Sequence, residues 1–195
     1  MVGVSILPVA IYSGELYFLF GKEQAMEKGL QGYSDFGGGR EDETTFEGAI
    51  REGCEELTGF FGNETQLREK INNAGGVYKV NHKGQYISHI FLTEYDRNLP
   101  MYFANNHYYL YEKMDNQLLK KTKMFEKIEL DWMTPDDMKR RRGEFRPFYR
   151  FIVDRILREL PKITSFLKSK QYKLRKRRTS NKTQKTMTNV NADNE

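Results

Sequence analysis

Residues 37–59 read GGGREDETTFEGAIREGCEELTG, and this stretch predicts a helix with a glutamate-rich end. Thr44 followed three residues later by Glu47 forms a capping box, which is typical of a helix start, and Gly59 is a stop signal. Apolar or small residues recur between these signals at helical spacing, at Phe46, Ile50, Gly53 and Leu57. The segment therefore predicts an amphipathic helix that packs one face on the rest of the fold.

Three carboxylates crowd the other side of this expected helix. At about 100° per residue, Glu52 lies about 40° from Glu56 and about 60° from Glu55, so all three should point away from the apolar face. They also lie in the half of the helix where the dipole repels negative charge. Arg51 can pair with Glu55, whereas Glu52 and Glu56 have no cation within the helix. Such a cluster suits a hard divalent ion, with a solvated acidic face as the alternative.

The residues before the helix favour the metal site. Gly37, Glu43, Arg51-Glu52 and Glu55-Glu56 are separated by the spacing G-x5-E-x7-R-E-x-x-E-E. In this the segment resembles the signature box of the Nudix hydrolases, G-x5-E-x7-R-E-U-x-E-E-x-G-U, where U is aliphatic. The sequence departs from that box at Gly53, which replaces an aliphatic residue, and by one extra residue before Gly59.

The resemblance implies hydrolysis of a nucleoside diphosphate linked to another group. It assigns Glu52, Glu55 and Glu56 as ligands of Mg²⁺ or Mn²⁺, which would neutralise the diphosphate and activate water. It also implies that Glu52 orients or deprotonates that water and that Arg51 orients the glutamates. Glu43 is expected to hold the preceding loop to the helix.

Further site residues are expected outside the glutamate cluster. The glycine-rich turn at Gly38 and Gly39 should let the backbone approach substrate phosphates. Trp132 is expected either to stack on a base or to lie in the core. Many members of the family add one more acid, for which Glu126 is the candidate; the alternatives are Glu94 and Glu129. A solvated strand glutamate is the competing interpretation of Glu126.

The remaining pattern predicts an α/β/α sandwich with a mixed sheet over residues 1–167. Hairpins are expected at residues 2–20 and 77–95, single strands at 32–36 and 125–132, and helices at 64–71, from Thr134, and over 145–166 with an interruption at Pro161. Residues 96–123 are expected to form a long connection with some helix. The strand at 85–95 has apolar residues on both faces, as in a sheet covered by helices on both sides.

The charge is unevenly distributed along the chain. Residues 161–195 carry a net charge of +8 and residues 1–160 carry −3, within a total of +5. Residues 168–195 are poor in apolar side chains and are expected to form a disordered basic tail. The run of Lys and Arg at 168–178 favours RNA binding or a nuclear address, with a solubilising tail as the alternative.

Other composition limits the classes of protein. A single cysteine, Cys54, excludes an intrachain disulfide and fits a reducing compartment, and its place beside the apolar face predicts a small buried side chain. The histidines at 82, 89 and 107 show no ligand spacing. No run of apolar residues is long enough for a membrane span, so a cytoplasmic protein is expected, with the nucleus as an option that the basic tail raises.

The sequence leaves the substrate and the oligomeric state open. The lead-in DFGGGRE at 35–41 resembles Nudix proteins of large DNA viruses and some eukaryotes, where removal of the mRNA 5′ cap is one activity. Diphosphoinositol polyphosphates and dinucleoside polyphosphates are alternative substrates. A Nudix fold that binds without turnover is an alternative from another class.

Overall fold

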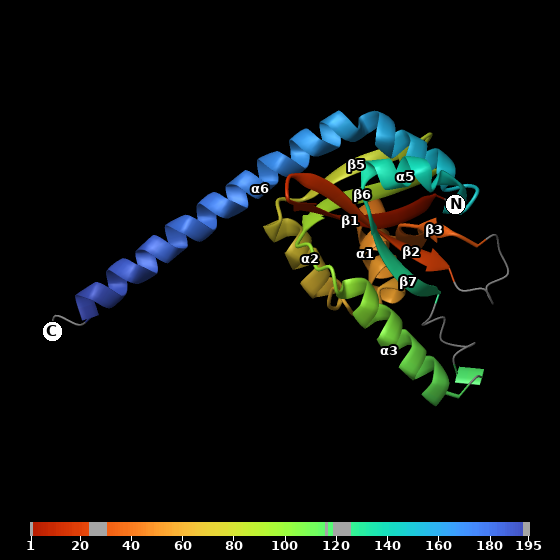
Figure 1. The fold of residues 1–195 in the computed structure, drawn as a ribbon, viewed down its shortest axis with the longest axis horizontal. Coiled ribbons are helices and arrows are strands. Elements are labelled where there is room, and N and C mark those ends of the chain that lie inside the picture. The colour runs from red at the N-terminus through yellow and green to blue at the C-terminus, as the bar shows by residue number, and fades with distance from the viewer. Residues whose placement is uncertain (1, 24–30, 116, 119–125, 193–195) are drawn as a thin grey trace.

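A computed structural model describes residues 2–23, 31–115, 117–118 and 126–192, with side chains described as far as residue 172. Within these residues a seven-stranded mixed sheet lies between two layers of helices (Figure 1). This confirms the predicted α/β/α sandwich.

The sheet is ordered β3-β2-β1-β6-β5, with β4 also pairing with β1 and β7 with β2. β1 and β6 run parallel, and the other pairs are antiparallel. The strands are β1 (Gly3–Tyr12), β2 (Glu15–Glu23), β3 (Tyr33–Ser34), β4 (Phe36–Gly39), β5 (Val77–His82), β6 (Tyr86–Thr93) and β7 (Lys127–Met133).

The helices divide between the two faces of the sheet. One core includes buried residues from α1, α2 and α3, and the other includes buried residues from α5 and α6. β6 contributes to both cores, as its sequence predicted: Phe91 faces one and Ile90 the other. The helices are α1 (Thr45–Glu56), α2 (Glu64–Asn73), α3 (Leu99–Lys113), α5 (Pro135–Arg140), a 3-10 turn (Arg142–Glu144) and α6 (Arg150–Ala192).

The first hairpin forms where the sequence predicts it. Tyr12 pairs with Glu15 across a two-residue turn in which Ser13 has φ 49° and Gly14 has φ 87°. Two consecutive positive φ values match the right-handed twist of the flanking strands. This turn aligns β1, on which the motif helix packs.

The single strand expected at 32–36 is instead two short strands separated by Asp35. The Asp35 carboxylate is buried and accepts hydrogen bonds from Ser5 (2.5 Å), Tyr86 (2.6 Å) and Ser88 (2.7 Å). Those three partners come from β1 and β6, so they draw the chain inward and it changes its pairing partner from β2 to β1. The sequence prediction was wrong here because these contacts are non-local.

The expected glycine-rich turn at residues 37–39 is also wrong, because these glycines form most of β4. They pair antiparallel with residues 3–5 of β1. A Cβ atom on Gly37 would lie 2.2 Å from the Val4 carbonyl oxygen, so only glycine fits at this close approach. The turn into α1 comes after the strand, at residues 40–44.

The C-terminal helix is longer than expected. α6 contains Pro161 without a break in its assignment, and Figure 1 shows the helix bending before it extends away from the domain. A proline inside a helix removes one backbone hydrogen bond and favours such a bend. Side chains after residue 172 lie outside the described part, so the disordered tail from residue 168 stays a prediction. The expected connection at 96–123 contains α3; residues 116 and 119–125 lie outside the described part.

Candidate functional site

The helix that presents the glutamates starts as its sequence predicts. Thr44 accepts a hydrogen bond from the Glu47 backbone N–H, and the Glu47 side chain accepts one from Thr44, which completes the capping box. Gly53 faces β1, where an added Cβ atom would lie 2.3 Å from Ile6 Cδ1. The glycine at this position of the box thus allows α1 to approach the sheet closely.

The extra residue of the motif changes how the helix ends. α1 stops at Glu56, and the next residues include Thr58 with φ 47° and Gly59 with φ 81°. A threonine in the left-handed region is sterically unfavourable, unlike a glycine. The change falls after Glu56, so the spacing of the three glutamates is unaffected.

Arg51 gathers the carboxylates at the outer side of α1. Its Nη1 donates to Glu52 Oε1 at 2.8 Å and to Glu55 Oε1 at 3.5 Å, and its Nη2 donates to Glu43 Oε1 at 2.9 Å and to the Gly39 carbonyl at 3.2 Å. The hydrogen bond from Arg51 lowers the pKa of Glu43. One guanidinium therefore joins the strand β4, the following loop and two of the candidate metal ligands.

The glycine at 38 gives Glu52 its place. A Cβ atom on Gly38 would lie 2.4 Å from Glu52 Oε2, so the carboxylate lies against the bare backbone of β4. The Glu52 side chain is 15% exposed, whereas that of Glu55 is 61% exposed. Gly38 thus makes room for the Glu52 carboxylate, and its contact to substrate stays a prediction.

Glu56 differs from the expectation. The sequence placed it on the outer side of the helix without a cation, but its side chain is only 4% exposed and Lys127 Nζ lies 3.4 Å from its Oε1. Its other oxygen, Oε2, accepts the Gly37 backbone N–H at 2.8 Å. Burial raises the pKa of Glu56, and the ammonium of Lys127 opposes this shift by stabilising the carboxylate.

Lys127 was not recognised as a site residue from the sequence. The whole residue is 1% exposed, and Nζ donates to Glu23 Oε1 at 2.6 Å and to Ser34 Oγ at 2.7 Å. Burial alone would lower the pKa of Lys127, but Glu56 and Glu23 raise it. Lysines are rarely buried without partners, and these partners come from β2, β3 and α1, so no local pattern could reveal them.

The donor atoms fit a divalent cation only in part. Glu52 and Glu55 supply the hard oxygen ligands that Mg²⁺ and Mn²⁺ prefer, and they already share one cationic nitrogen of Arg51. Glu56 has both oxygens engaged within the protein. In the part of the chain that the structure describes, no three His, Cys, Asp or Glu side chains converge as a metal site. The residues therefore fit a cation at Glu52 and Glu55.

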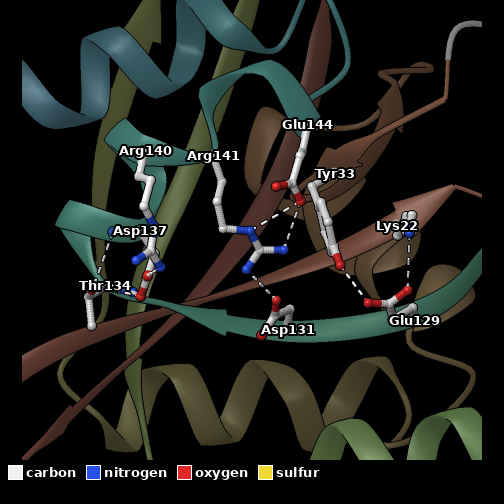
Figure 2. Close-up of polar contacts among 9 residues, drawn as sticks. All are labelled: Lys22, Tyr33, Glu129, Asp131, Thr134, Asp137, Arg140, Arg141 and Glu144. Carbon is white, nitrogen blue, oxygen red and sulfur yellow. Dashed lines mark hydrogen bonds and ion pairs between the residues drawn. The ribbon is translucent and has the colours of Figure 1, made fainter.

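The three candidates for an additional acid lie in different places. Glu126 directly precedes Lys127 in the chain, and its charge contributes to the raised pKa of Glu56, so it lies near the buried end of the cluster. Glu129 instead accepts from the Tyr33 hydroxyl at 2.5 Å and from Lys22 at 3.3 Å (Figure 2). Glu94 lines a cleft at the other end of β1. Proximity thus favours Glu126, whose role stays a prediction.

The network around Glu129 joins β7 to the α5 side of the sheet. Arg141 donates to Asp131 at 2.7 Å and to Glu144 at 3.0 Å, and its guanidinium lies 5.2 Å from the centre of the Tyr33 ring (Figure 2). The charged groups of this network are paired within it: Arg141 with Asp131 and Glu144, and Lys22 with Glu129. We therefore assign this network to fixing β7, the strand from which Lys127 reaches the other face.

Trp132 lies in the core, the second of the two expectations for it. The residue is 8% exposed, its Nε1 donates to the Asp96 carbonyl at 2.9 Å, and its ring lies 5.4 Å from that of Tyr95. Its ring is thus largely covered, which does not favour base stacking. An exposed ring occurs nearby instead: Tyr12 is 53% exposed and stacks on Tyr95 at 4.7 Å.

Cys54 and the histidines show no catalytic arrangement. Burial raises the pKa of the half-buried Cys54 thiol to about 11, which disfavours a nucleophilic thiolate. His89 Nδ1 donates to the Ser5 carbonyl at 3.0 Å, and burial lowers its pKa to about 4. Burial also lowers the pKa of His107 to about 4.

A cleft of about 780 Å³ opens at the carboxyl ends of β1 and β6. Tyr12 and Tyr95 form part of its wall, with Lys70 on α2 and Gln171 on α6. On β1 the cleft begins at Ile11, six residues after Ser5, which pairs with Gly37 next to the glutamate cluster. Six residues of a strand span about 20 Å. The cleft is therefore separate from the glutamate cluster.

No helix in the described residues combines the length and the apolar character that crossing a bilayer requires.

Comparison with known proteins finds similarity in three-dimensional structure. No family model matches the sequence, and no match was found among curated proteins. Of the solved structures, a Caenorhabditis elegans Ap4A hydrolase in a binary complex shares 13% identity over 86% of this chain and 98% of its own, with a TM-score of 0.47. The NUDIX domain of Shewanella oneidensis NrtR complexed with ADP ribose shares 11% over 82% and 88%, with a TM-score of 0.43. A Nudix hydrolase from M. smegmatis, RenU, shares 13% over 85% and 86%, at 0.43.

Proposed function

We propose that this protein is a Mg²⁺- or Mn²⁺-dependent pyrophosphohydrolase of the Nudix type, acting on a nucleotide-type diphosphate. The main support is the arrangement on α1, where Arg51 Nη1 joins Glu52 and Glu55 beside the bare backbone of Gly38. The spacing of the motif from Gly37 to Glu56 supports the same reaction.

Each residue has a distinct task in this proposal. Glu52 and Glu55 hold a divalent cation, which when bound neutralises the diphosphate and lowers the pKa of the attacking water. Glu52 accepts the proton from that water. Arg51 fixes both carboxylates and ties them to the carbonyl of Gly39. Glu126 is the additional acid of the site.

We assign capped RNA as the first substrate to test. The net charge of +8 over residues 161–195 supports attraction of RNA phosphates. The DFGGGRE lead-in supports the same substrate through its resemblance to viral and eukaryotic Nudix proteins. Dinucleoside polyphosphates and diphosphoinositol polyphosphates contain the same type of bond and are the alternatives.

The test is hydrolysis of a substrate panel by the full-length protein with Mg²⁺ or Mn²⁺. The panel contains capped RNA, dinucleoside polyphosphates, ADP-ribose, nucleotide sugars and inositol pyrophosphates. Glu55→Gln should abolish turnover, and Glu69→Gln, at an exposed position of α2, should not. Activity that survives Glu55→Gln removes the proposed site, and no turnover on any substrate favours a binding module.

The RNA assignment has its own test. Replacing the five cations at Lys173, Arg175, Lys176, Arg177 and Arg178 with glutamine keeps the chain length. Activity on capped RNA should fall and become less dependent on salt, while activity on a free dinucleotide stays the same. Equal loss on both substrates would contradict a recruiting role of the tail.

A further inference from the structure

Lys127 lies where the motif alone would place a metal ion. Its ammonium is 3.4 Å from Glu56 Oε1, and the Gly37 N–H occupies Glu56 Oε2. The side chains of Lys127 and Glu56 are 0% and 4% exposed. Glu56 is therefore supplied with a positive charge by the protein itself.

The structure fixes the ammonium from several directions. Glu23 and Ser34 lie at 2.6 and 2.7 Å from Nζ. The aliphatic part of Lys127 fills the space above Gly21, where a Cβ atom would lie 2.9 Å from its Cδ. The ammonium thus has partners on β2, β3 and α1, and Gly21 leaves space for the aliphatic part of the side chain. Lys127 is therefore held in one position by the surrounding fold.

The charges of this cluster are nearly balanced. Glu23 also accepts from Arg146 at 2.7 Å, so two buried carboxylates, Glu23 and Glu56, face two cations. Adding a divalent ion would leave an excess of positive charge where water is largely excluded, which is unfavourable. Glu126 lies close enough to act on Glu56 and is only half-buried.

We propose that Lys127 takes the place of a divalent metal ion beside Glu56, so that metal binds through Glu52 and Glu55 and not through Glu56. This inference rests on the proposed function for its catalytic meaning. In it Lys127 is a positioning residue, since it touches Glu56 and not the reacting atoms. Glu56 then orients the end of α1 and the amide of Gly37.

The test is Mn²⁺ binding to the full-length protein without substrate, followed by electron paramagnetic resonance. The wild-type protein should bind Mn²⁺. The Glu55→Gln variant should lose this binding, and the Glu56→Gln variant should retain it. Lys127→Met should gain one bound Mn²⁺ per chain, and the double variant Lys127→Met/Glu56→Gln should lose that gain. Circular dichroism establishes that each variant is folded.

Two results would overturn the inference. One is loss of wild-type Mn²⁺ binding on Glu56→Gln, which would make Glu56 a ligand; this measurement does not depend on Lys127→Met folding. The other is a folded Lys127→Met that binds no additional Mn²⁺. Failure of the proposed function looks different, because no panel substrate would then be hydrolysed while the Mn²⁺ results for Lys127 and Glu56 could still be as expected.

Discussion

Two cations face the glutamates of α1, and their surroundings are opposite. Arg51 is on the same helix, its side chain is 22% exposed, and its partners lie within twelve residues in the sequence. Lys127 comes from β7, is buried, and holds partners that are 71 to 104 residues away. Arg51 therefore pairs with the carboxylates that solvent can reach, and Lys127 neutralises the one that solvent cannot reach.

The largest expected effect is on the free energy of unfolding, at the buried ion pair of Lys127 with Glu23. Glu23→Gln leaves Lys127 and Arg146 short of a counter-charge, and removing one partner of a buried ion pair costs about 3–5 kcal/mol. Urea unfolding measures this loss. Asp136→Asn is the control, because Asp136 and its partner Lys139 are 91% and 61% exposed and their pair is worth under about 1 kcal/mol. Equal losses for both variants would remove the contrast between the two regions.

The second largest effect is a loss of stability at acidic pH, which follows from the burial of His89 on β6. His89 is neutral in the folded protein because burial lowers its pKa to about 4, against about 6.5 when unfolded. Stability is thus full above pH 6.5 and falls by up to about 3 kcal/mol as the pH drops toward 4. His89→Asn, whose amide can still donate to Ser5, should flatten this dependence in urea unfolding at several pH values. An unchanged slope would contradict the buried neutral state.

On the exposed side, activity should change more than stability. Arg51→Gln releases Glu52 and Glu55, and a small misplacement of catalytic groups costs about 100-fold in rate. Its surface pairs contribute under about 1 kcal/mol each to stability. Turnover and urea unfolding of one preparation separate the two effects. A large loss of stability without a loss of rate would place Arg51 with Lys127 as a structural cation.

The smallest effect is expected at the close contact between α1 and β1. Gly53→Ala adds a methyl group 2.3 Å from Ile6 Cδ1, and such overpacking costs about 1–3 kcal/mol. Ile6→Ala removes both Cδ1 and Cγ1, which would lie 2.3 and 2.5 Å from that methyl group, so Gly53→Ala should cost less in the Ile6→Ala background than alone. A double-mutant cycle measures the coupling. Simple additivity would show that α1 tolerates the extra methyl group by shifting.

The local parts of this fold could be predicted from the sequence. Residues close together in the chain determine the capping box at Thr44, the first hairpin turn and the burial of both faces of β6. The pairing of Arg51 with Glu55 is also local. These features depend on helix and strand periods, which a sequence displays directly.

The parts that could not be predicted depend on distant pairings. β4 pairs with β1 through glycines that look like a turn, and Asp35 changes the partner of its strand through hydroxyls of β1 and β6. Burial of Glu56 follows from the register of β7 on β2, which sets Lys127 opposite Glu23. A helical wheel shows only which side Glu56 is on, and not what lies there.

The most direct measurement is the rate of diphosphate hydrolysis by Glu52→Gln relative to the wild-type protein, at saturating Mg²⁺. We expect a loss of about 10²–10⁴-fold, because Glu52 is proposed to accept the proton of the attacking water, and an unchanged unfolding midpoint in urea. A wild-type rate in folded Glu52→Gln would contradict the assignment of the α1 glutamates as the hydrolytic site.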